Sequence, residues 1–204
     1  MSTQLSAQVS DVGVLVLAAG EGRRLGLGPK AHVRLGEETF LERVVCTSRE
    51  AGLDRIWAVG SPTDSLLPAA CAGLRIHYVL NPTPALGMSS SIHTGLAAAL
   101  AERRRALLIF PVDVPLVRAS TLVALLAAEH ADSCARPLHD GHHGHPILLG
   151  AALAARVLAL GPDTPLRDAL ASLRAPLIDV PVDDAATLQN VNTPEDLATA
   201  RSTC

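Results

Sequence analysis

The chain has 204 residues, and its 20 acidic residues outnumber its 17 basic ones, which gives a formal net charge of −3 and an isoelectric point near 6.2. Lys30 is the only lysine, and all the other basic residues are arginines. With no overall positive charge and only 2% aromatic residues for base stacking, the composition argues against a nucleic-acid-binding protein. The 49% apolar fraction can fill the core of one domain over residues 1–204, with a folded part at about 12–201.

The sequence also argues against membrane insertion, disulfides and structural zinc. No apolar run approaches the roughly 18 to 20 residues that span a bilayer, and the first residues lack the basic and apolar regions of a secretion signal. The cysteines lie far apart and form no C-x-x-C pair. They are Cys46, Cys71, Cys134 and Cys204. We therefore expect a soluble cytoplasmic protein with reduced thiols, in which Cys46 and Cys71 occupy core-like helical stretches.

Apolar periodicity predicts strands that alternate with helices. Short apolar runs predict strands at residues 12–18, 55–59, 74–80, 106–110 and 177–182. Apolar stripes at helical spacing predict helices at residues 39–51, 91–105 and 119–130. Capping residues followed by proline predict helix starts at residues 61–64, 163–165 and 193–196.

This order of elements predicts the fold class. Alternation of strands and helices favours a parallel sheet with helices on both faces. Residues 134–138 and 146–149 flank a turn rich in glycine and histidine, which predicts an inserted hairpin. We expect an α/β fold of the Rossmann-like three-layer αβα type, with a mostly parallel mixed sheet and this small hairpin.

The strongest chemical signal follows the first predicted strand, in the stretch L-A-A-G-E-G-R-R-L-G-L-G-P-K that ends at Lys30. Its closely spaced glycines let the backbone turn tightly and expose N–H groups that can bind phosphate oxygens. Arg23, Arg24, Lys30 and Arg34 outweigh Glu21, so the stretch is locally basic and predicts an anionic ligand. The glycine spacing matches neither the dinucleotide fingerprint nor the P-loop, which disfavours an NAD-dependent oxidoreductase.

The pattern L-A-A-G-x-G-x-R-x-G, followed by a lysine, resembles the signature loop of the nucleotidyltransferases of the MobA and MocA type. That family has a Rossmann-like fold and transfers NMP from an NTP to a phosphorylated acceptor. The resemblance implies that Arg24 and Lys30 are catalytic residues on the phosphates of the NTP, with Arg23 as a secondary candidate. The other nucleotide-binding residues that it implies in this loop are Leu17, Ala18, Ala19, Gly20 and Gly22.

Two further segments complete a predicted magnesium site. Asp113 follows the predicted strand 106–110, at the edge where open α/β sheets bind their ligands. Its D-x-P segment resembles the one that binds Mg²⁺ in the family, which makes Asp113 both a catalytic and a metal-binding candidate. The segment N-V-N-T-P-E-D-L is similar to another family segment and implies Asn192 as the second metal ligand, with Asn190 as the substitute. Carboxylate and amide oxygens suit such a hard cation.

The resemblance also assigns the base and acceptor sides of the site. Residues 87–92 resemble a G-M-x-x-S-[IL] segment that faces the base and ribose, although serines there also serve as helix caps. The base-side candidates are Asn81, Gly87 and Ser89. The G-x-x-G-H-P turn at 141–146 resembles one on the acceptor side, so His145 is the acceptor-binding candidate, and a plain polar turn stays open. The spacing of its histidines does not aim them at one zinc ion.

These segments, in order from residue 14 to residue 197, predict a Mg²⁺-dependent nucleotidyltransferase. The L-A-A-G sequence and the histidine turn favour a MocA-like CTP:molybdopterin cytidylyltransferase, whereas the two asparagines favour a MobA-like enzyme that uses GTP. A sugar phosphate is another candidate acceptor. An alternative of a different class is a non-catalytic accessory protein that binds the molybdenum cofactor. Delivery of the cofactor would add a contact with a molybdoenzyme or its chaperone.

Overall fold

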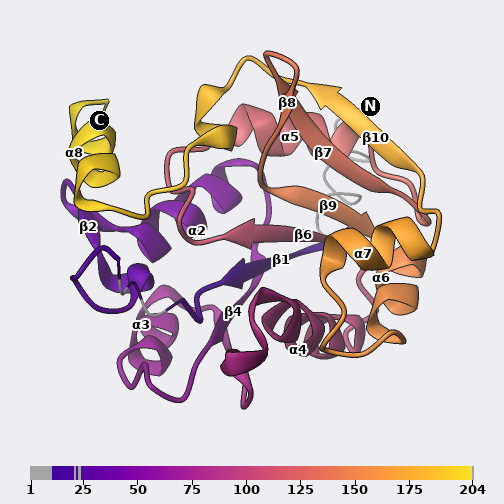
Figure 1. Cartoon of the computed structure of the whole chain (residues 1–204), viewed down its shortest axis with the longest axis horizontal. Helices are drawn as coiled ribbons and strands as arrows, with labels where there is room; N and C mark the ends of the chain where they lie inside the picture. The colour runs from indigo at the N-terminus through magenta and orange to yellow at the C-terminus, as the bar shows by residue number, and fades with distance from the viewer. Residues whose placement is uncertain (1–10, 21, 23, 204) are drawn as a thin grey trace.

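The computed structural model describes residues 11–20, 22 and 24–203. One eight-stranded sheet crosses this part of the chain, with helices packed around it (Figure 1). Its strands are β1 (Val12–Leu17), β4 (Arg55–Gly60), β5 (His77–Leu80), β6 (Ala106–Pro111), β7 (Cys134–His139), β8 (His142–His143), β9 (Ile147–Gly150) and β10 (Leu177–Pro181). Their order across the sheet is β10-β7-β9-β6-β1-β4-β5, and β8 pairs with β7.

Strand β1 lies between β4 and β6 and runs parallel to both. All six of its residues are buried. Val14 and Val16 pack into the core on one face of the sheet, and Leu15 and Leu17 pack into the core on the other. A central strand covered on both faces needs apolar residues at every position, which explains why its sequence shows a continuous apolar run instead of an alternating one.

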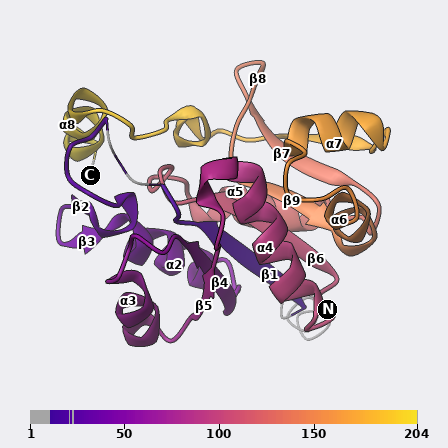
Figure 2. The same cartoon turned by 60° about the horizontal axis from the view of Figure 1, so that its bottom comes forward.

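The helices divide between these two faces. The first core takes buried residues from α2 (Phe40–Glu50), α3 (Leu67–Leu74), α5 (Ala119–Ala127) and α8 (Pro194–Ser202). The second takes them from α4 (Met88–Leu100), α6 (Ala151–Leu158) and α7 (Leu166–Ser172). In Figure 2, α4, α6 and α7 gather in the right half of the view, and α2, α3 and α8 lie in the left half. This confirms the predicted three-layer αβα fold.

The predicted hairpin accounts for the mixed character of the sheet. Strand β9 runs antiparallel to both β6 and β7, with Cys134 opposite Leu149. Strand β10 then returns parallel to β7 at the edge. The sheet is therefore parallel from β6 to β5 and changes direction only where the hairpin enters.

Several predicted helix boundaries differ from the structure, and α5, for example, ends at Ala127 instead of residue 130. Helix α4 begins at Met88 instead of residue 91, because Gly87, at φ +86°, adopts a conformation that admits few other residues and turns the chain into the helix early. It ends at Leu100, so residues 103–105 lie beyond it. Helix α3 begins at Leu67 instead of within 61–64, and Asp64 accepts hydrogen bonds from the N–H groups of Leu66 and Leu67.

Other helix starts show which capping signals were informative. Thr193 and Asp196 form a capping box at the start of α8, as the sequence predicts. Helix α7 begins after Pro165, as residues 163–165 predicted. Its N-terminus has no side-chain cap, so the predicted capping hydrogen bond is not formed. None of the helices in the described ranges combines the length and the hydropathy that crossing a bilayer requires.

The cysteines differ in their surroundings. Cys71, in α3, and Cys134, in β7, are buried, whereas Cys46 is exposed on α2, so the prediction that Cys46 lies in the core is wrong. Burial raises the pKa of Cys71 to about 11 and the pKa of Cys134 to about 12. Cys204 lies outside the described residues.

We expect a disulfide reagent such as DTNB at pH 8 to modify Cys46 much faster than Cys71 or Cys134 in the folded protein. Burial shields Cys71 and Cys134 from the reagent and also raises the pKa of both thiols, and a protonated thiol is a poor nucleophile. Peptide mapping after timed labelling measures the three rates, and labelling in guanidinium chloride is the control in which all three react. Equal rates in the folded protein would contradict this packing.

Candidate active site

The candidate site lies at the carboxyl ends of β1 and β6. The two strands are in parallel register, with Leu17 opposite Pro111, and the N–H of Val112 donates to the carbonyl of Leu17 at 3.2 Å. The loop after β1 therefore begins beside the segment that carries Asp113. This edge of a parallel sheet is where α/β proteins bind their ligands.

The glycine-rich loop folds back on itself so that Lys30 lies near the start of the loop. Gly22 has φ +62°, and its carbonyl accepts from the N–H groups of Leu25 and Gly26. A Cβ atom at Gly22 would lie 2.1 Å from the carbonyl oxygen of Gly28, so only glycine fits there. The Lys30 N–H then donates to the carbonyl of Gly20 at 3.4 Å. The predicted residue Arg23 lies outside the described residues.

Lys30 occupies the centre of the site. Its Nζ donates to Oδ2 of Asp113 at 2.7 Å and to Oδ1 of Asn192 at 2.5 Å. The side chains of Lys30 and Asp113 are only 12% and 16% exposed, so water screens their attraction weakly. The structure thus brings together the three residues that the sequence predicted as catalytic lysine and metal ligands, although they come from segments far apart in the chain.

The same geometry tests whether these residues suit a metal ion. A carboxylate oxygen and an amide oxygen converge on one cationic group, the ammonium of Lys30, and they are the oxygen donors that Mg²⁺ prefers. Within the described ranges, no group of three or more His, Cys, Asp and Glu side chains is placed to hold a metal ion. A cation bound by Asp113 and Asn192 would therefore need further ligands, from water or from a bound molecule.

The approach to α8 fixes the position of Asn192. The N–H groups of Asn192 and Thr193 both donate to Oδ2 of Asp196 at 2.9 Å, and these bonds lower the pKa of that carboxyl group. The N–H of Val191 donates to the carbonyl of Asp113 at 2.8 Å. The helix cap therefore also aims the amide oxygen of Asn192. Asn190 is exposed and is not among the residues that line the cavity described below.

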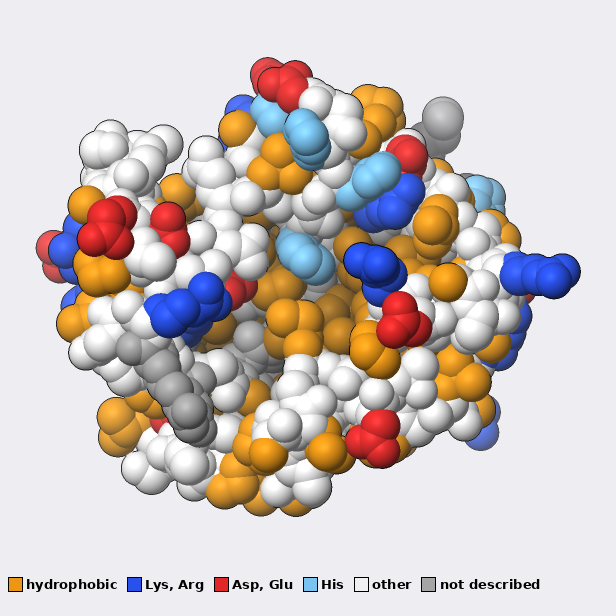
Figure 3. Space-filling view, viewed as in Figure 1, with side chains coloured by type: hydrophobic (Ala, Val, Ile, Leu, Met, Phe, Trp, Pro, Cys, Tyr) orange, Lys and Arg blue, Asp and Glu red, His pale blue; other side chains and the backbone are white. Residues whose placement is uncertain are grey.

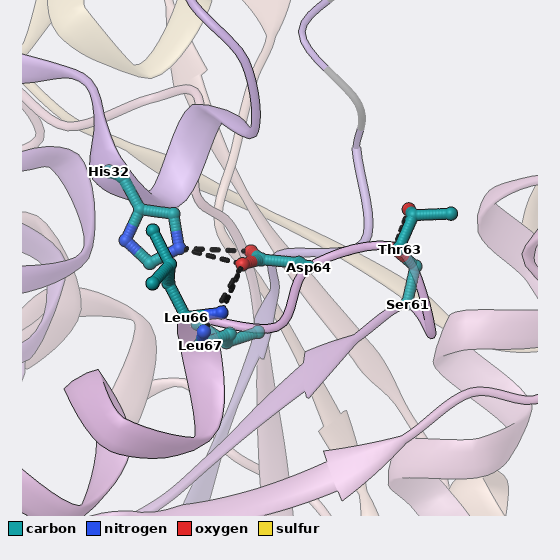
Figure 4. Close-up of polar contacts among 6 residues, drawn as sticks. All are labelled: His32, Ser61, Thr63, Asp64, Leu66 and Leu67. Atoms are coloured by element: carbon teal, nitrogen blue, oxygen red, sulfur yellow. Dashed lines mark hydrogen bonds and ion pairs between the residues drawn. The ribbon is translucent and has the colours of Figure 1, made fainter.

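Lys30 belongs to a 3-10 turn, η1 (Lys30–His32), which a buried carboxylate holds in place (Figure 4). Nε2 of His32 lies 2.9 and 3.0 Å from the two carboxylate oxygens of Asp64. The Asp64 side chain is 3% exposed, and it also accepts from the first N–H groups of α3. The turn that carries Lys30 is thus tied to the start of α3.

We expect His32→Ala to destabilise the fold by about 1–3 kcal/mol, because the substitution leaves the buried carboxylate of Asp64 without one of its partners. His32→Gln, which retains a hydrogen-bond donor, is expected to recover part of this loss. Urea unfolding curves measure both effects. Arg49→Ala is the matched control, because Arg49 ties α2 to the other end of α3 through the exposed hydrogen bond to the carbonyl of Leu74. If His32→Ala lowers the free energy of unfolding no more than Arg49→Ala does, the His32–Asp64 contact does not stabilise the fold as described.

A cavity of about 590 Å³ opens beside Lys30. The residues that the sequence predicted and that line this cavity are the nucleotide-binding candidates Leu17, Ala19, Gly20, Gly22, Arg24, Lys30 and Gly87 and the metal-binding candidates Asp113 and Asn192. The residues that the sequence prediction missed are Pro84, Ala85, Met88, Ser91, Pro111 and Val112. Met88 and Val112 directly adjoin Gly87 and Asp113, and the other four lie within three positions of a predicted residue, so proximity in sequence was the available signal.

Three predicted residues lie elsewhere. Asn81 is fully buried, its Nδ2 donates to the hydroxyls of Ser90 and Ser91, and its Oδ1 accepts from the N–H of Thr83. The prediction that Asn81 contacts the base is therefore wrong, because its side chain is not accessible. Asn81 instead stabilises the segment before α4 through these hydrogen bonds. Ala18 is buried and lines a smaller cavity behind the loop. Ser89 lines a second large cavity instead of the first.

This second cavity, of about 790 Å³, adjoins the first and shares the wall formed by Leu17, Gly87, Met88 and Pro111. Figure 3 shows a hollow with an apolar floor near the middle of this face, and histidine and basic side chains around it. His145 is one of its lining residues.

His145 lies in a rigid turn. Its N–H donates to the carbonyl of Thr187 at 2.8 Å, and a Cβ at Gly144 would lie 2.3 Å from the same oxygen, so this close approach needs glycine. Burial lowers the pKa of His145 and so favours the neutral ring, although the negative charge of Asp113 acts in the opposite direction. Nδ1 of His145 has no hydrogen-bond partner among the described residues. Two nearby histidines have other partners: the ring of His139 lies at hydrogen-bond distance from the carbonyl of Val182, and the ring of His143 lies beside the carboxylate of Asp179.

Comparison with known proteins shows which family the chain belongs to. A family profile described as the MobA-like NTP transferase domain matches residues 14–177. The chain belongs to this family. The predicted resemblance is thereby confirmed, and the chain is identified as a nucleotidyltransferase domain. The family match covers the glycine-rich loop, Asp113 and the second cavity, but not Asn192.

Individual relatives of this MobA-like domain have different described functions. The bifunctional protein GlmU of Azorhizobium caulinodans is 33% identical over 150 residues, which cover 70% of this chain and 33% of that protein. A probable molybdenum cofactor guanylyltransferase of Opitutus terrae is 31% identical over 116 residues, or 57% of this chain and 54% of that protein. The matches thus span about a third and about half of these relatives.

Solved structures support the fold. A nucleotidyl transferase from Methanothermobacter superposes with a TM-score of 0.80 at 24% identity, over 94% of this chain and 96% of that one. The superposition thus extends over nearly the whole of both chains. At this level of identity the similarity establishes the fold, and the roles of individual residues rest on the site geometry.

Proposed function

We propose that residues 1–204 act as one domain that transfers NMP from an NTP to a phosphorylated acceptor and releases pyrophosphate. The observation that carries this proposal is the convergence of Lys30, Asp113 and Asn192 at the wall of a cavity bounded by the glycine-rich loop. Phosphates, a divalent cation and a lysine are the components that phosphoryl-type transfer needs in one place.

We further propose a MocA-like CTP:molybdopterin cytidylyltransferase, with GTP as the alternative nucleotide. The L-A-A-G sequence and the histidine turn support CTP, and the asparagine pair supports GTP. The guanylyltransferase of Opitutus terrae is described as acting on the molybdenum cofactor, which supports a pterin acceptor over a sugar phosphate. His145, in the adjoining cavity, is proposed to contact that acceptor.

In the proposed mechanism, an oxygen of the acceptor phosphate attacks the α-phosphorus of the NTP in line. The bond to the bridging oxygen breaks, and pyrophosphate leaves with the electron pair. Lys30 and Arg24 neutralise charge on the leaving phosphates, and the backbone N–H groups of the loop orient them. A phosphomonoester is already ionised near neutral pH, so no general base is needed. Asp113 and Asn192 would hold Mg²⁺, which supplies further charge neutralisation on the triphosphate.

The test of this function is pyrophosphate release with CTP, GTP, ATP and UTP, each with and without molybdopterin. We expect release only with acceptor, fastest with CTP, abolished by EDTA and restored by excess Mg²⁺. Asp113→Asn should require a higher Mg²⁺ concentration for half-maximal rate, because it removes the anionic ligand. If none of the four nucleotides gives pyrophosphate release although NTP binding is measurable, the result would favour the non-catalytic accessory protein.

Lys30→Ala is expected to lower kcat by about 10²–10³-fold while the Kd for the NTP rises by less than about tenfold, because charge on the leaving group develops mainly in the transition state. Lys30→Arg is the matched variant, because it retains the positive charge but replaces the compact ammonium with a planar guanidinium group. It should restore the affinity for the NTP more fully than it restores kcat. Stopped-flow turnover and equilibrium binding separate the two effects. An unchanged kcat in Lys30→Ala would remove Lys30 from the mechanism.

A further inference from the structure

The position of the Lys30 ammonium depends on the backbone that carries it. Lysine has a flexible four-carbon stem, so Nζ keeps its contacts with Asp113 and Asn192 only if the Cα of Lys30 is held in place. The hydrogen bond from the Lys30 N–H to the carbonyl of Gly20 is long, at 3.4 Å, and therefore weak. The attachment of the turn η1 to the rest of the fold thus matters for the site.

Two side chains attach this turn to its surroundings. Ala31 is fully buried in the core, but apolar packing has no preferred direction. His32 adds a directional contact, because a carboxylate only accepts hydrogen bonds and Nε2 of His32 is therefore the donor to Asp64. Oδ1 of Asp64 also accepts from the N–H groups of Leu66 and Leu67, whereas the described partner of Oδ2 is His32. The orientation of the turn follows from this pair.

The pair lies away from any bound ligand. Neither His32 nor Asp64 is among the described residues that line the two large cavities, whereas Lys30 lines the first. Figure 4 shows the two side chains facing each other, with His32 at the end of η1 and Asp64 in the loop before α3. A ligand in the first cavity therefore meets Lys30 but not these two residues. Any effect of the pair on that ligand must pass through Lys30.

We propose that His32 and Asp64 are positioning residues for Lys30. The buried carboxylate fixes the imidazole, the imidazole fixes the turn, and the turn sets where the ammonium lies. The inference rests on the proposed function in one respect, namely that Lys30 acts on the triphosphate. Because a displacement of about 1 Å can slow an enzymatic reaction by about 10²-fold, a contact outside the cavity can control turnover.

The single lysine of the chain makes its placement measurable without any nucleotide. When the protein is labelled with carbon-13 and nitrogen-15 in lysine alone, every side-chain NMR signal comes from Lys30. We expect His32→Ala to move the Nζ resonance towards that of free lysine. The Nζ hydrogens should also exchange with water at least about tenfold faster, because the ammonium leaves its hydrogen-bond partners more often. His32→Gln, which retains a donor, should give intermediate values.

Thr121→Ala is the matched control for a general loss of stability. Oγ1 of Thr121 donates at 2.7 Å to Asp184, another buried carboxylate, and Thr121 is not among the described residues that line the two large cavities. This variant should leave the Lys30 signal unchanged. All spectra are recorded well below the melting temperature of each variant. An unchanged Lys30 signal in His32→Ala, or an equal change in Thr121→Ala, would overturn the proposal.

Turnover provides a second test, which depends on the proposed function. His32→Ala should lower kcat for pyrophosphate release by about 10–10²-fold with little change in the Kd for CTP. In the Lys30→Ala background, the same substitution should lower kcat by less than about twofold, because the group that it positions is gone. Effects that multiply in the double variant would refute positioning through Lys30. Absence of release by the wild type would instead count against the proposed function, and the Lys30 spectra would still test the positioning.

Discussion

The contact between the ammonium of Lys30 and the oxygens of Asp113 and Asn192 organises the candidate site. It joins three segments that are 83 and 162 residues apart in the chain, namely the glycine-rich loop, the end of β6 and the approach to α8. Because the groups are largely shielded from water, each depends on the other two for balanced charge and hydrogen bonding. The backbone bond from Val191 to Asp113 reinforces the same junction. The fold therefore positions Lys30, Asp113 and Asn192 together.

Features that depend on short stretches of sequence were predictable. The apolar run from Val12 indicated a central strand because burial on both faces leaves no place for polar residues. The glycine-rich loop indicated a tight turn because positive φ and close backbone approach are local requirements, and Gly22 meets both. The capping box at Thr193 was also local, and its further role in aiming Asn192 follows from the hydrogen bonds that define it.

Features that depend on tertiary contacts were not predictable from these patterns. Asn81 looked like a base contact, but its surroundings direct all of its described hydrogen bonds to neighbouring protein groups. The pair formed by His32 and Asp64 joins residues whose proximity no local pattern indicates. The second cavity draws on residues from Leu17 to Leu177, so its shape and charge exist only once the sheet and α7 have assembled.

The hairpin that introduces β9 into an otherwise parallel half-sheet has a consequence for how this domain can change. Apart from Asn192, the first cavity is built from residues before position 114, whereas much of the second comes from residues 134–177, around and after that hairpin. Insertions or substitutions in the later region can alter the second cavity while Lys30, Asp113 and the glycine-rich loop keep their positions. The architecture thus lets one of the two cavities change independently of the other.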